Sequence, residues 1–419
     1  MARILAYTSP ALGHLFPLAP ILLELQRRGH AVALRTLAAG VARMRDAGLD
    51  AAPIDGRIEA IALDDYRAKS PAGSIARSTA VFAARAAHEV SDLRAAIERE
   101  RPDAVVVDIN TWGAMAAAEA WGGPWAVFCP YPIPLGSPDA PPFGLGLPPA
   151  RGPLGRLRDA AVRPLVMGAV ERATLPKVAT LRAGLGLAPF RSLDELQTAA
   201  PLLIYLTAEP FEYPRRDWPA SYALVGPTQW EPPHDPLPWL DAVDRPIVLV
   251  TTSSEFQDDG KLVRTAFEAL AGEDVFVVAT LPSGDPDGYE VPANARLERF
   301  VPHGAVLPRA ACAVTHGGMG ATQKALAHGV PVCAVPFGRD QFEVARRVEV
   351  AKAGTRLPAT RLSPDRLRAK VREAIARRAG AEAIARAYRA AGGAGAAADA
   401  VEGRLVGQAA ARARTPAVA

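Results

Sequence analysis

The sequence predicts an α/β protein of two domains, each with a parallel β-sheet surrounded by helices. The chain has 419 residues, which is long for one hydrophobic core and suits two. In both halves, short apolar runs alternate with segments of helical periodicity, the pattern of βαβ units. A proline-rich stretch without periodicity, residues 214–240, has the composition of a linker. We therefore predict domains at 1–213 and 241–381, a helical segment at 382–405, and a disordered tail at 406–419.

The composition is that of an ordinary globular protein, with 49% hydrophobic and 22% charged residues. The formal charge of +4 comes with arginines dispersed over helix faces, which favours solubility over nucleic-acid binding. The cysteines show neither a disulfide framework nor metal-ligand spacing, as expected in a reducing cytoplasm (Cys129, Cys312 and Cys333). The N-terminus lacks a signal-peptide pattern, and no apolar run reaches the ~18 residues of a membrane span. We therefore expect a cytoplasmic protein without a membrane span.

The chain opens with a βαβ unit: a strand at 4–8, a helix at 15–28 and a strand at 30–35. Only Gly13 lies in the first turn, and the absence of G-x-G-x-x-G argues against a dinucleotide site. His14 follows at the carboxyl end of a strand, the edge where parallel sheets bind ligands. An imidazole there can take a proton from an attacking hydroxyl, although a helix cap or a surface residue is the alternative interpretation.

The rest of the first half continues the same alternation. Helices are predicted at 38–48, 74–99, 112–121 and 155–184, and strands at 51–54, 102–108, 124–129 and 202–207, the last strand of this domain. We predict a polar, mobile loop at 55–73. Asp108 closes a buried strand and either caps the next turn or belongs to the site. Residues 130–149 are too rich in proline for regular structure, so they form either a pocket wall at this edge or a rigid surface loop.

The second half contains the most informative stretch, residues 314–341. A strand at 310–314 ends at Gly317 and Gly318, a helix follows at 320–328, and a strand at 332–336. Glycines between strand and helix let the backbone approach an anion, and the free N–H groups of the first helical turn then point at it. Thr322 adds a hydroxyl, and His316 adds a cation or a hydrogen-bond donor. These features predict a diphosphate site; a tight turn without a ligand is the alternative.

Three patterns in this stretch carry a family resemblance: H-x-G-x-G-x-T, A-x-x-x-G-V-P-x-x-x-x-P and D-Q. Together with G-H-x-x-P-L at 13–18, they resemble the UDP-glycosyltransferase superfamily, and most closely its bacterial branch that glycosylates macrolides and other antibiotics. The resemblance implies the GT-B fold, two Rossmann-like domains whose parallel sheets face each other across a cleft. It also implies an inverting, metal-independent hexosyltransferase with no cofactor, using a UDP or TDP sugar as co-substrate. The acceptor would be a hydroxyl of a hydrophobic natural product, such as a macrolide, a polyketide or an aromatic antibiotic.

The resemblance also implies roles for individual residues. His14 would be the general base and Asp108 its partner. The 382–405 segment would pack back on the N-terminal domain. The chain would function either as a monomer or as a homodimer. A further set of residues would contact the diphosphate, the sugar and the base of the donor: Ser253, Phe300, Val301, His316, Gly317, Gly318, Gly320, Thr322, Asp340 and Gln341. The acceptor would contact Pro10, Phe16, Tyr131 and Phe143.

Two positions depart from the family pattern. Lys324 stands where the family usually has a glutamate that grips the ribose, and the segment 300–303 stands where W-x-P-Q is typical. A lysine has no acceptor, which predicts tolerance of TDP donors. Another GT-B enzyme, such as a sugar-nucleotide epimerase or a lipid-linked glycosyltransferase, is one alternative. A non-catalytic protein that binds a nucleotide or a metabolite is the other.

Overall fold

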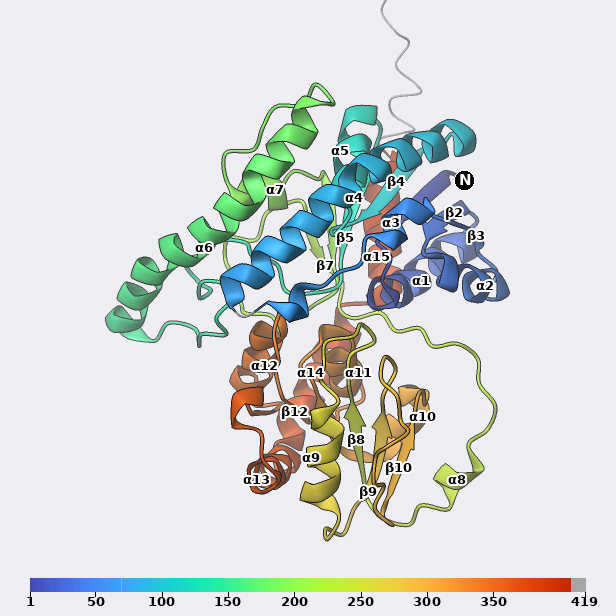
Figure 1. Ribbon diagram of the computed structural model, residues 1–419. Coiled ribbons are helices and arrows are strands. Elements are labelled where there is room, and N and C mark those ends of the chain that lie inside the picture. Colours follow the sequence, from blue (N-terminus) through green and yellow to red (C-terminus); the bar gives the residue numbers. More distant parts are fainter. Residues whose placement is uncertain (69, 408–419) are drawn as a thin grey trace, which may run out of the picture.

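The computed structural model describes residues 1–68 and 70–407 and contains two α/β domains, one above the other in Figure 1. In this described part the N-terminal sheet has seven parallel strands, in the order β3-β2-β1-β4-β5-β6-β7. They are β1 (Arg3–Tyr7), β2 (Ala31–Thr36), β3 (Asp50–Pro53), β4 (Ala104–Asp108), β5 (Trp125–Cys129), β6 (Leu202–Tyr205) and β7 (Tyr222–Leu224). The predicted fold class is confirmed.

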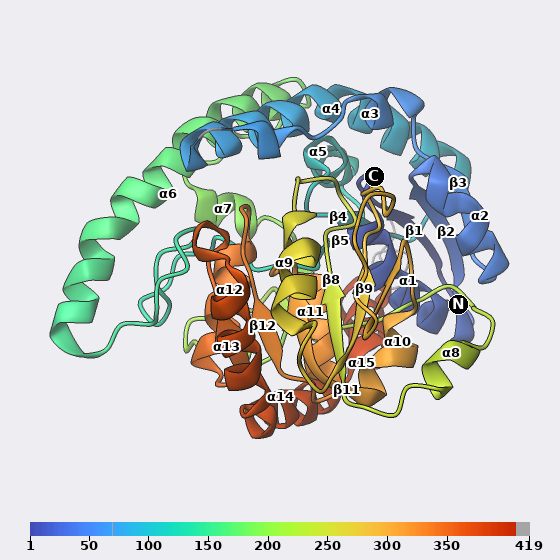
Figure 2. The same cartoon turned by 60° about the horizontal axis from the view of Figure 1, so that its bottom comes forward.

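Helices cover both faces of this sheet (Figure 2). They are α1 (Leu12–Arg27), α2 (Ala38–Asp46), α3 (Gly56–Ala60), η1 (Asp65–Arg67), α4 (Pro71–Glu100), α5 (Trp112–Trp121), α6 (Gly152–Ala183) and α7 (Leu193–Gln197). Strand β4 shows why the sheet is buried on both sides. Val106 packs in the core beside α1, while Val105 and Val107 pack in the core beside α4 and α5. Its continuous apolar run therefore suits a sheet between two helical layers.

The C-terminal sheet has six parallel strands within the described residues, in the order β10-β9-β8-β11-β12-β13. They are β8 (Ile247–Thr251), β9 (Phe276–Thr280), β10 (Ala295–Glu298), β11 (Ala310–Thr315), β12 (Val332–Ala334) and β13 (Gly354–Arg356). Helices around it are α8 (Pro238–Asp241), α9 (Lys261–Leu270), α10 (His303–Val306), η2 (Leu307–Arg309), α11 (Met319–Ala327), α12 (Gln341–Val350), η3 (Ala359–Arg361), α13 (Pro364–Ile375) and α14 (Arg378–Ala390).

Two sequence predictions about the N-terminal domain were wrong in detail. The strand at 202–207 is not the last of the domain, because β7 pairs with β6 from inside the segment predicted as linker. Its three residues follow an irregular, proline-rich stretch and are too few to show a period. The 55–73 segment is not wholly irregular either, since α3 and η1 lie within it and α4 begins at Pro71. Asp55 caps α3 by accepting a hydrogen bond from Arg57 N.

The C-terminal helices divide between the two domains. Tyr388 and Ile384 of α14 pack in the core of the C-terminal domain. After Gly392, α15 (Gly393–Val401) and the π-helical turn η4 (Glu402–Val406) pack on the N-terminal domain, where Val401 and Leu405 join the core beside α1 (Figure 1). The predicted return to the N-terminal domain thus begins near 393 and not at 382. The predicted tail lies outside the described residues from 408 onward.

Candidate active site

His14 and Asp108 meet at the carboxyl edge of the N-terminal sheet. Strand β4 ends at Asp108, whose side chain is fully buried, and α1 begins two residues before His14. His14 Nδ1 lies 2.8 Å from Asp108 Oδ2 and 2.9 Å from Oδ1. The carboxylate also accepts hydrogen bonds from Ser9 Oγ at 2.7 Å and Ser9 N at 3.1 Å. These bonds hold the carboxylate against the imidazole, so Nδ1 carries the proton and Nε2 is left to accept one.

The charges around this pair shift both pKa values. Burial alone would lower the pKa of His14, but the charge and hydrogen bond of Asp108 outweigh it, and the pKa is raised. Asp340 and Glu255 of the C-terminal domain add to the rise. Burial would raise the pKa of Asp108, yet His14 and the hydrogen bonds lower it, so the carboxyl stays ionised. The pair is thus arranged as an imidazole base with a fixed anionic partner.

Asn110 is a neighbour of this pair that sequence reasoning missed. Its Nδ2 lies 3.3 Å from His14 Nε2, and its Oδ1 accepts a hydrogen bond from the Tyr131 hydroxyl at 2.7 Å. The Tyr131 ring lies 5.7 Å from the His14 ring. Asn110 follows Asp108 by two residues in the turn after a buried strand, which is the one signal in the sequence that could have indicated it. It marks the position next to Nε2 where a hydroxyl substrate would compete.

The first loop of the C-terminal domain lies directly across from α1. A Cβ atom at Gly13 would meet Ser254 Oγ at 4.0 Å, so the two domains are in contact beside His14. Ser253, a predicted phosphate contact, is buried; its backbone N donates to Asp259 at 2.8 Å and its Oγ accepts from Glu255 N at 3.1 Å. This loop is therefore held in a fixed conformation in the cleft.

The glycine turn after β11 has the close packing expected of an anion loop. Gly317 has a φ of +85°, and a Cβ at Gly318 would lie 2.2 Å from His316 Nε2, so neither position accepts a side chain without movement. His316 is buried, and its Nδ1 has no hydrogen-bond partner within the described residues. Burial lowers the pKa of His316, which favours the neutral imidazole, a ring with one N–H donor and one acceptor nitrogen.

The residues around this turn differ in burial and in the space around their side chains. Thr322 is fully buried and its hydroxyl lies 3.3 Å from that of Thr315, which in turn accepts from Gly317 N. Thr322 thus shapes the turn from beneath. Gly320, in the first turn of α11, would place a Cβ in open space. Its surroundings are therefore open on the side where the helix N-terminus exposes its N–H groups.

The predicted sugar contacts follow β12. Gln341 is buried and its amide bridges two loops: Oε1 accepts from Phe337 N and Gly338 N, and Nε2 donates to Gln257 at 2.7 Å. Asp340 is half-buried, and burial raises its pKa. Among the described residues, no side chain donates a hydrogen bond to the Asp340 carboxylate.

The predicted base contacts follow β10, an edge strand of the C-terminal sheet. Phe300 is 53% exposed, which leaves its ring free to stack, whereas Val301 is buried. Lys324 does not point to solvent: its Nζ lies 2.6 Å from Glu231 Oε1. Glu231, which comes from the linker, also accepts from His303 N and Gly304 N. A carboxylate is therefore present beside Lys324 after all, supplied by a segment that the sequence does not relate to this site.

The predicted acceptor residues are spread over the N-terminal half of the cleft. Tyr131 lies next to His14, and Pro10 is half-buried in the loop between β1 and α1. Phe16 packs on Trp230, with ring centroids 5.1 Å apart. Phe143 is half-buried in the 130–149 segment. In the described residues there is no group of three or more metal-binding side chains, and no helix long and apolar enough to cross a membrane.

Parts of the sequence, and nearly all of it in one case, are similar to known proteins. A family model described as "Erythromycin biosynthesis protein CIII-like, C-terminal domain" matches residues 264–400. The 4'-demethylrebeccamycin synthase of Lentzea aerocolonigenes is 35% identical over 388 residues, which cover 89% of this chain and 92% of the relative. UDP-glycosyltransferase 2 of Phaeomoniella chlamydospora is 30% identical over 258 residues, 58% of this chain and 57% of that protein.

Solved structures share the whole architecture. The glycotransferase of kitacinnamycin superposes with a TM-score of 0.74 at 26% identity, covering 96% of this chain and 99% of that one. The glycosyltransferase VinC, solved in complex with DTDP, superposes with a TM-score of 0.69 at 26% identity, covering 98% of this chain and all of VinC, 100%. The calicheamicin glycosyltransferase CalG4, at 23% identity and a TM-score of 0.72, supports the fold alone. The chain therefore belongs to the antibiotic glycosyltransferases of the GT-B fold, the family that its sequence motifs predict.

Proposed function

We propose that the protein transfers a hexose from a TDP or UDP sugar to a hydroxyl of a hydrophobic natural product, with inversion and without a metal ion. The observation that carries the proposal is the His14–Asp108 pair at the edge of one sheet, in contact with the first loop of the other domain. A base in this position lies close enough to Asp340 and Glu255 of the C-terminal domain for their charges to raise its pKa. A non-catalytic protein that only bound a nucleotide would not need this base.

In the proposed reaction the acceptor hydroxyl takes the place of Asn110 beside His14 Nε2. The hydroxyl proton passes to Nε2 while the acceptor oxygen forms a bond to the anomeric carbon. The bond from that carbon to the diphosphate oxygen breaks, and the nucleoside diphosphate leaves with the electron pair. Asp108 stabilises the imidazolium that forms, because its carboxylate is ionised and bonded to Nδ1. A single displacement of this kind inverts the anomeric carbon.

The leaving diphosphate is held by neutral donors in this proposal. In this proposal the N–H groups of the first turn of α11 bind the diphosphate, and His316, whose pKa burial lowers, supplies a further N–H. Backbone amides fixed before the reaction starts stabilise developing negative charge without reorganisation. This arrangement takes the part that a cation has in other enzymes, which is why we propose metal independence.

Product detection tests the proposed function. The purified protein is incubated with TDP-glucose or UDP-glucose and a panel of macrolide lactones, polyketides and aromatic phenols, and products are identified by mass spectrometry. We expect a hexosylated product, the same rate with EDTA, and a TDP donor used at least as well as the UDP donor. Conversion of the sugar nucleotide without an acceptor would indicate an epimerase. Nucleotide binding with no product from any combination of donor and acceptor would indicate a non-catalytic protein.

A first prediction concerns the donor turn. His316→Ala is expected to weaken binding of free TDP by about 1.5–3 kcal/mol, the range for hydrogen bonds to charged groups, and Thr322→Val by about 0.5–1.5 kcal/mol, the range for hydrogen bonds between neutral groups. His316 acts directly, whereas Thr322 acts through Thr315 and the Gly317 amide. Calorimetry measures the affinity, with His328→Ala as control, because His328 is exposed at the end of the same helix. Unchanged affinity in both variants would place the diphosphate elsewhere.

A further inference from the structure

The segment that carries the predicted sugar contacts is attached at one end to an N-terminal loop. Arg339 donates two hydrogen bonds to Asp65 of η1, Nη2 to Oδ1 at 2.7 Å and Nε to Oδ2 at 2.9 Å. Asp65 is only 3% exposed, and Arg339 has a φ of +53°, a left-handed conformation that is uncommon for residues other than glycine. The neighbouring rings of Tyr66 and Phe256 meet edge to face at 5.3 Å. This contact joins the two domains over the cleft.

The other end of the same segment is attached to the 130–149 loop. Glu343, which is 1% exposed, accepts hydrogen bonds on one oxygen from Gly144 N and Gly146 N, both at 2.8 Å. Arg346 Nε donates to Gly146 O at 2.7 Å. A Cβ at Gly146 would lie 2.5 Å from the carbonyl oxygen of Phe342, so the loop backbone lies directly on the start of α12. Phe143, a predicted acceptor contact, is adjacent.

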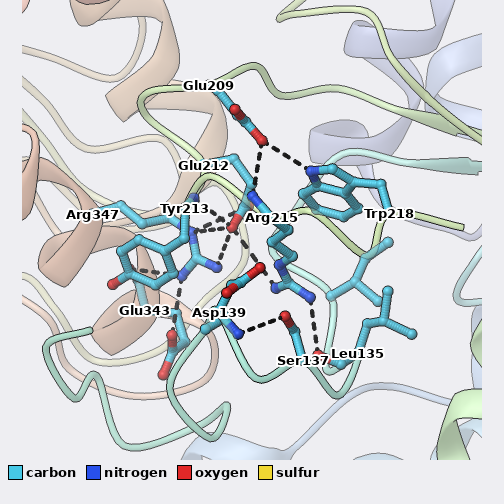
Figure 3. A network of polar contacts seen from close by, with 12 residues as sticks. Leu135, Ser137, Asp139, Glu209, Glu212, Tyr213, Arg215, Trp218, Glu343 and Arg347 are labelled. Atoms are coloured by element: carbon cyan, nitrogen blue, oxygen red, sulfur yellow. Dashed lines mark hydrogen bonds and ion pairs between the residues drawn. The ribbon is translucent and has the colours of Figure 1, made fainter. Parts of the chain in front are cut away.

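A buried ion-pair network fixes the Glu343 carboxylate in place (Figure 3). Its second oxygen accepts from Arg347 Nη1 at 3.0 Å. Arg347 also bonds Glu212 of the N-terminal domain, at 2.7 Å for Nη2 to Oε1, and Glu212 accepts from the Tyr205 hydroxyl at 2.8 Å. Because these charges are buried and paired, Glu343 has little freedom to turn away from the loop.

We propose that residues 339–343 form a bridging segment that positions two N-terminal loops, 61–68 and 141–149, relative to the donor sugar, with Asp65 and Glu343 as positioning residues. The bridging segment holds Asp340 and Gln341 between its two attachment points, Arg339 and Glu343. A sugar bound to Asp340 therefore stabilises the conformation in which both loops are attached. By reciprocity, attached loops favour the sugar-bound state, so donor sugar and acceptor are coupled through this segment. The inference rests on the proposed function, because it takes the donor sugar to bind at Asp340 and Gln341.

Hydrogen exchange measures this coupling without turnover or a known acceptor. In the wild type, TDP-glucose is expected to slow exchange in peptides covering 61–68 and 141–149 more than TDP alone does, because only the sugar reaches the bridging segment. Asp65→Asn and Glu343→Gln are expected to remove this difference for the loop that each residue holds. The matched controls are Asp64→Asn, whose partner Arg77 is exposed, and Glu373→Gln of α13, whose partner Lys370 is partly exposed and touches neither loop. Both controls should behave as the wild type.

A second variant tests the contact from the loop side, should Glu343→Gln fail to fold. Gly146→Ala forces a Cβ against the backbone of α12, while Gly152→Ala, at a φ of +67° like the +57° of Gly146, meets no atom within 4 Å. Once an acceptor is found, Asp65→Asn and Gly146→Ala should raise its KM by about ten-fold or more, the effect of losing uniform binding. Binding of TDP alone should stay within about two-fold.

Three outcomes overturn the inference. The first is the same sugar-dependent slowing in Asp65→Asn and Glu343→Gln as in the wild type. The second is a wild type that binds TDP-glucose yet shows no more slowing than with TDP. The third is a loss of TDP affinity in these variants that matches the rise in acceptor KM, which is what a merely structural defect would produce. A wild type that binds none of TDP, UDP, TDP-glucose and UDP-glucose refutes the proposed function itself, and with it this inference.

Discussion

His14→Ala is expected to lower kcat by about 100-fold or more, the usual contribution of general-base catalysis. The imidazole is placed for this by Asp108, which holds Nδ1 and leaves Nε2 as the acceptor of the proton. Initial rates with the acceptor and donor found by product detection give kcat, and calorimetry gives TDP affinity, which should stay within about two-fold because His14 lies in the other domain. His234→Ala, at an exposed histidine, should have the rate of the wild type.

The variant Asp108→Asn tests whether His14 acts as a general base or has only a structural role. Asp108 is what raises the pKa of His14 against the effect of burial, so its removal should lower that pKa. A base with a raised pKa is active above that pKa and loses activity as the pH falls through it. The acidic limb of the kcat/KM profile should therefore move to lower pH in Asp108→Asn, while the plateau rate falls because the imidazolium is no longer stabilised. Near-normal turnover of His14→Ala would refute the assignment.

Arg347→Met is expected to cost about 3–5 kcal/mol of stability, the effect of leaving a buried charge without its partner. Glu212 is fully buried and Glu343 is 1% exposed, and Arg347 is the cation between them. Urea unfolding followed by tryptophan fluorescence measures the change. Arg372→Ala serves as control, because its ion pair with Glu273 is largely exposed and is worth at most about 1 kcal/mol.

The double variant Arg347→Met with Glu343→Gln should recover part of this loss, because it removes the carboxylate that loses its cation, whereas Glu212 keeps Arg215 nearby. A loss in Arg347→Met as small as in the exposed control would mean that the network in Figure 3 does not stabilise the protein. It would also weaken the case that Glu343 is held rigidly against the 130–149 loop.

Local sequence signals were sufficient for much of the fold. The turn from β1 to α1 and the glycine turn from β11 to α11 each combine an apolar run, a turn residue and a helical period within about 20 residues. His14 follows β1 and Asp108 ends β4, and these two strands pair as neighbours, so the parallel sheet brings both residues to the same edge. A carboxyl-edge site in an α/β sheet is thus predictable from strand ends alone.

What the sequence did not predict depends on contacts between distant segments. Strand β7 is three residues long and finds its place only by pairing with β6. Glu231 reaches Lys324 from 93 residues away, and Glu343 reaches Gly144 across 199. Such pairs have no spacing that repeats and no local propensity, so only the packed domains reveal them. Asn110 is the exception, since its place two residues after Asp108 was visible in the sequence.

The anomeric configuration of the first product tests the central claim most directly. Given an α-linked donor such as TDP-glucose and a proton-accepting His14, a single displacement predicts a β-linked product. The coupling constant of the anomeric proton in the NMR spectrum of the purified product reports the configuration. A β-linked product whose formation depends on His14 is the result predicted here. An α-linked product would require a second displacement or a different route, and would contradict the assignment of His14 as the base of a single inverting step.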